Sequence, residues 1–88
     1  MDHLIYQRYL QEYVRRAVQA SDGSVRSIAE ELGTIRVSGL LTLHKEEKRR
    51  ALADARHAFD EHRHWPLEII LSHLGVGVGP ATPPGAAG

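Results

Sequence analysis

The densest group of acid–base and metal-binding side chains lies between Asp54 and His64. Asp54, His57 and Glu61 are three and four residues apart, so a helix would bring them onto one face. His57 and His62 are five residues apart, which misses the i,i+4 spacing of a two-histidine zinc clamp. We therefore predict no resident metal. A response to pH is the alternative use of these histidines, because imidazole titrates near neutrality.

Side chains suited to covalent or phosphate chemistry are scarce. The chain has no cysteine, which excludes disulfides, thiolate zinc sites and thiol nucleophiles. Ser24, Ser27 and Ser38 are typical of helix caps and turns. The alternating glycines at 75–79 follow an expected helix and not a strand, so a dinucleotide-binding loop is excluded by context. The sequence predicts no catalytic residue, no cofactor and no enzyme activity.

Positive charge is concentrated in the middle of the chain. Residues 34–56 contain six Lys/Arg and three Asp/Glu, a local charge of +3 in a protein with zero net charge. The basic side chains on one flank of the expected helix in this region are Lys45, Lys48, Arg49 and Arg56. Such a row could follow a phosphate backbone. Acidic residues four positions from Arg50 support the alternative of a solvated, salt-bridged surface.

Residues 24–56 resemble a helix-turn-helix, a common DNA-binding unit. Ala29 and Gly33 have the four-residue spacing of that motif, and Gly33 is expected to end the first helix with positive φ. One extra residue in the turn would bring Leu40 and Leu43 to buried positions. The resemblance predicts a DNA-binding surface made of Arg36, Ser38, Lys45, Lys48, Arg49 and Arg56, with Arg36 and Ser38 nearest the bases.

The periodicity of apolar residues predicts a mostly all-α domain over residues 1–75. The expected helices cover residues 2–20, a short stretch centred on 25–32 with Ser24 or Ser27 as its cap, 43–62, and the segment from Pro66 to Gly75. Segment 34–41 also fits a short strand, which would pair across a dimer as in ribbon-helix-helix proteins. The Gly/Pro/Ala-rich residues 76–88 are expected to form a disordered tail.

Two apolar faces are candidate interfaces. One is a tyrosine stripe on the first helix, and the other is an alanine-rich face on the third. Their residues are Tyr6, Tyr9, Tyr13, Ala51, Ala55 and Phe59. Because a core of this size supplies only about 3–5 kcal/mol, a homodimer through these faces is expected. Stacking of single-stranded bases on the tyrosines would need Lys or Arg on the same helical face, which that face lacks.

The leading expectation is a small cytoplasmic, homodimeric regulator that binds double-stranded DNA. No apolar run approaches the ~18 residues of a membrane span. The alternative is a helical adaptor or inhibitor of phage or plasmid type, which binds another protein through its helical surface. Zero net charge favours the adaptor, whereas the local +3 segment favours the regulator.

Overall fold

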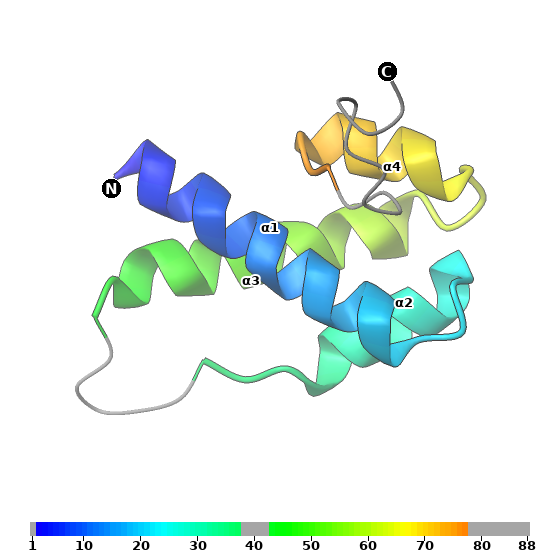
Figure 1. Ribbon diagram of the computed structural model, residues 1–88, viewed down its shortest axis with the longest axis horizontal. Coiled ribbons are helices and arrows are strands. Elements are labelled where there is room, and N and C mark those ends of the chain that lie inside the picture. The colour runs from blue at the N-terminus through cyan, green and yellow to red at the C-terminus, as the bar shows by residue number, and fades with distance from the viewer. Residues whose placement is uncertain (1, 38–42, 78–88) are drawn as a thin grey trace, which may run out of the picture.

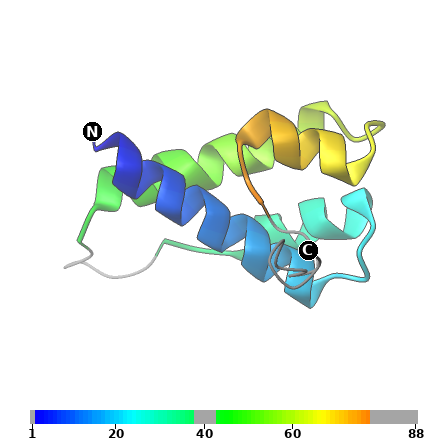
Figure 2. The same cartoon turned by 45° about the horizontal axis from the view of Figure 1, so that its top comes forward.

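The computed structural model describes residues 2–37 and 43–77, and within these ranges the chain forms helices and no strand. The helices are α1 (His3–Ala20), α2 (Val25–Thr34), α3 (Lys45–Glu61) and α4 (Leu67–Leu74). α1 lies across α3 with both helices starting on the same side, while α2 and α4 run back (Figures 1 and 2). The predicted all-α class is confirmed. In the segment proposed as a strand, residues 35–37 are irregular, and 38–41 lie outside the described residues.

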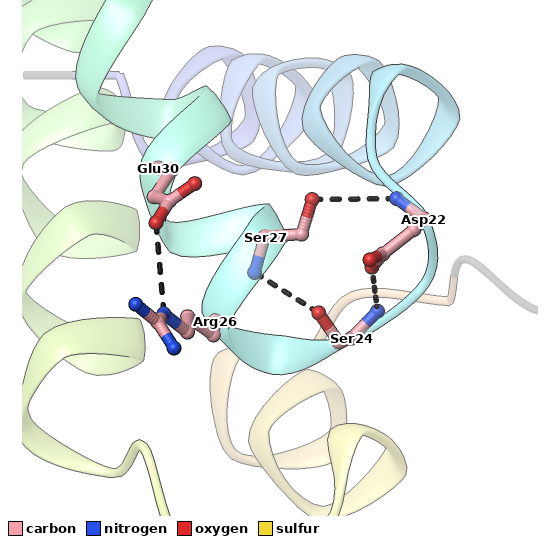
Figure 3. A network of polar contacts seen from close by, with 5 residues as sticks. All are labelled: Asp22, Ser24, Arg26, Ser27 and Glu30. Carbon is pink, nitrogen blue, oxygen red and sulfur yellow. Dashed lines mark hydrogen bonds and ion pairs between the residues drawn. The ribbon is translucent and has the colours of Figure 1, made fainter.

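Local side chains define the starts of α1 and α2. The Asp2 carboxylate accepts hydrogen bonds from the backbone N–H groups of Leu4 and Ile5 at 3.0 and 3.2 Å. The Ser24 hydroxyl accepts from the Ser27 N–H at 3.1 Å, which confirms Ser24 as the cap of α2 (Figure 3). Both side chains satisfy N–H groups that a helix leaves unpaired.

The turn before α2 is closed by the polar network of Figure 3. The Asp22 carboxylate accepts from the Ser24 N–H at 2.9 Å, and the Ser27 hydroxyl accepts from the Asp22 N–H at 3.3 Å. The bonds from Ser24 are the main reason that the pKa of Asp22 is lowered. Gly23 has a φ of +95°, a conformation that costs glycine little. This turn therefore sets α2 against the end of α1.

The end of α2 differs from the prediction. Gly33 lies inside the last turn and keeps ordinary negative φ, so the positive φ predicted there is wrong. The helix continues to Thr34, whose hydroxyl donates to the Glu31 carbonyl at 2.8 Å. Ten residues, 35–44, then separate α2 from α3, whereas a helix-turn-helix has a turn of about 3–4 residues. Leu43, expected at a buried position of that motif, is 75% exposed.

The core lies where α1, α2 and α3 meet and extends beneath α4. Its largest fully buried side chains are Leu10, Val14, Ile28, Leu32, Phe59 and Ile70. As predicted, Gly75 ends α4, with a φ of +73°. Val76 beyond it is only 5% exposed, so the core extends one residue past the expected boundary at 75. None of the helices in the described ranges combines the length and apolarity of a membrane span.

α4 is fastened to α1 as well as to α3. The Gln7 side-chain amide donates to the Gly75 carbonyl at 3.0 Å and to the Leu74 carbonyl at 3.4 Å. The Val76 N–H donates to the Leu71 carbonyl at 2.8 Å. These bonds satisfy the C-terminal carbonyls of α4, which would otherwise lack partners.

The faces expected to bind a second copy are largely used within the chain. Ala51, Ala55 and Phe59 are completely buried in the core, and Tyr13 is 5% exposed. Tyr6 and Tyr9 are half-buried and pack against the same core. Small alanine side chains permit close approach of another helix, and α1 of the same chain supplies that helix. Ala51, Ala55 and Phe59 therefore build the core and are not an exposed interface.

Ala55→Leu should destabilise the protein, because the added atoms have no space between α1 and α3. We expect a loss of about 1–3 kcal/mol in the free energy of unfolding, measured by urea denaturation. Ala53→Leu is the matched control, since Ala53 is exposed on the same helix; its effect should stay within about 0.5 kcal/mol. Equal effects of the two substitutions would contradict this packing.

Candidate nucleic-acid interface

Two adjoining hollows bring basic side chains from three elements together. The first, of about 160 Å³, is lined by Tyr9, Glu12, Tyr13, Arg16, Arg36, Val37 and Lys48. The second, of about 210 Å³, is lined by Ile35, Arg36, Val37, Arg49, Leu52 and Arg56. Arg36 and Val37 line both hollows, so the two form one continuous surface. α1, residues 35–37 and α3 each contribute to it.

The first hollow combines aromatic rings with cations. The Lys48 Nζ lies 5.0 Å from the centre of the Tyr9 ring, and the Arg16 guanidinium carbon lies 5.9 Å from that of Tyr13. The two tyrosine rings stack with their centres 6.2 Å apart. A cation within about 6 Å of a ring face is attracted by it. Arg16 of α1 and Lys48 of α3 both lie over the tyrosine rings, so the expectation that this face of α1 lacks a cation is wrong.

Arg56 has a structural role in place of the predicted phosphate contact. It is half-buried, and its Nε donates to the Leu32 carbonyl at 2.9 Å. Its Nη2 donates to the Ile35 carbonyl. These two carbonyls lie at the C-terminal end of α2. Each has one further and longer contact of 3.4 Å, from the Ile35 N–H to the Leu32 carbonyl and from Arg36 Nη1 to the Ile35 carbonyl. The guanidinium is therefore committed to joining α2 to α3.

Most of the other predicted DNA-binding residues are exposed. Arg36 donates from Nη1 to the Gly33 carbonyl at 2.9 Å, and Arg49 lies 4.0 Å from the Glu46 carboxylate. Exposed ion pairs contribute little, so Arg49 can exchange its partner readily. Lys45 lies outside the two hollows, in a separate hollow with Glu46, Glu47 and Arg50. Ser38 lies outside the described residues.

Sequence reasoning missed Arg16. Its Nε lies 3.2 Å from the Glu12 carboxylate, an exposed i,i+4 pair. The only signal available was its place one turn after Tyr13 and one turn before the end of α1. We define the basic surface as Arg16, Arg36, Lys48 and Arg49, the cations of the two hollows other than Arg56.

The predicted histidine cluster lines a different hollow, of about 270 Å³, between α1, α3 and α4. The Glu61 carboxylate lies 3.3 Å from His57 and 3.2 Å from His62, and the His62 ring stacks on Trp65. The Asp54 carboxylate accepts a 2.6 Å hydrogen bond from the Tyr6 hydroxyl. In the part of the chain that the structure describes, no three such groups are placed to ligate a metal.

Comparison with protein-family models, with curated proteins and with solved structures gives no match. The functional assignment therefore depends on the geometry and charge of this chain. The basic surface is the stronger candidate site, because its cations come from separate elements and only Glu12 among its lining residues is acidic.

Arg56→Met should weaken the join between α2 and α3 while keeping the aliphatic part of the side chain. The Leu32 and Ile35 carbonyls would lose their hydrogen bonds to the guanidinium and keep only their 3.4 Å contacts to the Ile35 N–H and to Arg36 Nη1. The free energy of unfolding should therefore fall by about 1–3 kcal/mol. Arg49→Met is the matched control on the same helix and should change it by less than about 0.5 kcal/mol. Urea denaturation monitored by circular dichroism measures both. Similar values for the two variants would refute the structural role of Arg56.

Tyr6 should make stability decline at high pH. Burial and then the hydrogen bond to Asp54 raise the pKa of Tyr6 from 10.0 to about 12. The unfolded chain therefore ionises first as the pH rises above 10.0, and the stability supplied by Tyr6 is lost between there and about 12. Tyr6→Phe should show a smaller decline in unfolding midpoint between neutral pH and about pH 11. Burial also raises the pKa of Tyr13, so part of the decline should persist. An unchanged decline would count against this assignment.

Proposed function

We propose that this protein binds nucleic acid through the basic surface and acts as a small regulator without enzymatic activity. One observation carries the proposal. Four cations from α1, residues 35–37 and α3 gather around two adjoining hollows, in a chain whose net charge is zero. Each cation that neutralises a phosphate releases about one counterion, which favours binding without requiring a basic protein.

The distribution of charge favours one orientation on the nucleic acid. The hollow on the other side of α1 carries Asp54 and Glu61, whereas the basic surface carries Glu12 as its only carboxylate. A phosphate backbone is attracted to the basic surface and repelled by the hollow that carries Asp54 and Glu61. The protein would therefore bind through α1 and the first half of α3, with α4 directed away.

The proposal does not use a helix-turn-helix. Ten residues separate α2 from α3, and neither helix is placed by a short turn as a recognition helix. Contacts would go mainly to phosphates, which position a protein without reading sequence. Homodimerisation stays a prediction, and its expected surface no longer includes Ala51, Ala55 and Phe59.

A protein-binding adaptor is the second candidate, favoured by exposed apolar side chains. Trp65 and Ile69 are 37% and 49% exposed around the start of α4. Leu4, in the first turn of α1, and Leu43, just before α3, are more exposed still. Because these side chains are distributed over several elements, they favour a protein partner less strongly than the basic surface favours nucleic acid.

Salt-dependent binding tests the first proposal. The full chain is titrated into labelled DNA of mixed sequence, offered as duplex and as single strand, at several salt concentrations. Affinity should fall with salt. Arg36→Ala/Lys48→Ala/Arg49→Ala should reduce the magnitude of the log–log slope by about 2–3, since each phosphate contact contributes about 0.7–0.9.

The control variant is Arg15→Ala/Arg26→Ala/Arg63→Ala, which removes the same charge from exposed positions outside the two hollows. It should keep most of the affinity. An equal loss in both triple variants would show that net charge matters and the basic surface does not. Absence of salt-sensitive binding to either form of DNA would sink the proposal and leave the adaptor ahead.

A further inference from the structure

We propose that the nucleic acid bound is single-stranded and that one of its bases stacks at Tyr9; this inference rests on the proposed function. The first hollow has the parts that such a site needs. It contains a half-buried aromatic ring and cations from two helices and from residues 35–37. Stacking on aromatic side chains beside a cationic groove is the usual way in which proteins hold single strands.

The Tyr9 ring lies beside two other aromatic rings. Tyr13 stacks against it with ring planes 29° apart, and His44 lies 6.5 Å away at a tilt. The Lys48 ammonium lies over the ring at 5.0 Å. A base that stacks on Tyr9 replaces this ammonium, which then lies beside the phosphate of the same nucleotide. The Tyr9 ring would thus contact the base while Lys48 contacts the phosphate of the same nucleotide.

The shape of the site favours a single strand over a duplex. Lys48 and Arg16 lie over rings that line a recess of about 160 Å³ between α1 and α3. In a duplex the bases are stacked inside the rod, which presents phosphates to the recess but no free base. A single strand can turn one unstacked base into it.

Glu12 supports the same conclusion. Glu12 lines the recess, and its carboxylate, paired with Arg16 Nε at 3.2 Å, would still disfavour a phosphate placed directly against it. A base edge can instead offer an amino group, which a carboxylate accepts as a hydrogen bond. The mixed charge of the recess is therefore better matched to a whole nucleotide than to phosphates alone.

The test compares one labelled DNA strand of mixed sequence with the duplex that it forms after annealing, using the full chain at fixed salt. The wild type should bind the single strand more tightly. Tyr9→Leu should weaken binding to the single strand about 5- to 100-fold, the range typical of losing one base–aromatic stack, and should weaken binding to the duplex far less. Tyr9→Phe, which keeps the ring, should retain single-strand affinity.

A second measurement covers the case in which Tyr9→Leu fails to fold. In the wild type, NMR signals of the Tyr9 ring, assigned by their loss in Tyr9→Phe, should shift on addition of the single strand and not of the duplex. Duplex affinity equal to or above that for the single strand, or ring signals that do not move, would overturn this inference and leave the proposed function standing. Binding to neither form would overturn both.

Discussion

The close packing of α1 on α3 over two small side chains is the constraint on which the rest of the structure depends. Ala51 and Ala55 are completely buried, so the backbones of the two helices can approach closely. The same crossing brings Tyr9 and Tyr13 to the side of α3 that carries Lys48. The core and much of the candidate site are therefore consequences of one helix pair. α2 and α4 cover the rest of the core.

Local signals predicted most of the fold. Apolar periodicity placed the four helices, and Ser24 and Gly75 marked a start and an end at the correct residues. Gly33 misled, because a glycine near a helix end is usually its C-terminal cap. Here the Glu31 and Gly33 carbonyls accept from the nearby Thr34 and Arg36 side chains. The Leu32 carbonyl accepts its shorter bond from Arg56, which is 24 residues away in the sequence. Side chains thus replaced the backbone bonds of a glycine cap, and the part played by Arg56 could not be read from any local pattern.

The candidate site was predictable only in part. Charge clustering pointed to Arg36, Lys48 and Arg49, which the structure places around the two hollows. Arg16 was missed, because its nearness to them depends on how α1 crosses α3. The role of the apolar faces was also not predictable, because it depends on which helix covers them. A sequence indicates that Ala51 and Ala55 need a close neighbour, but it does not tell whether that neighbour belongs to the same chain.

The bond from Gln7 to the Gly75 carbonyl joins groups that are 68 residues apart in the sequence. It connects α1, the first helix, to the end of α4, the last helix described. Ile70 of α4 is also completely buried in the core, so opening of α4 would expose the core that α1 and α3 build. A domain linked in this way is expected to lose its helices in a single cooperative transition, without a partly folded form from which α4 alone has separated.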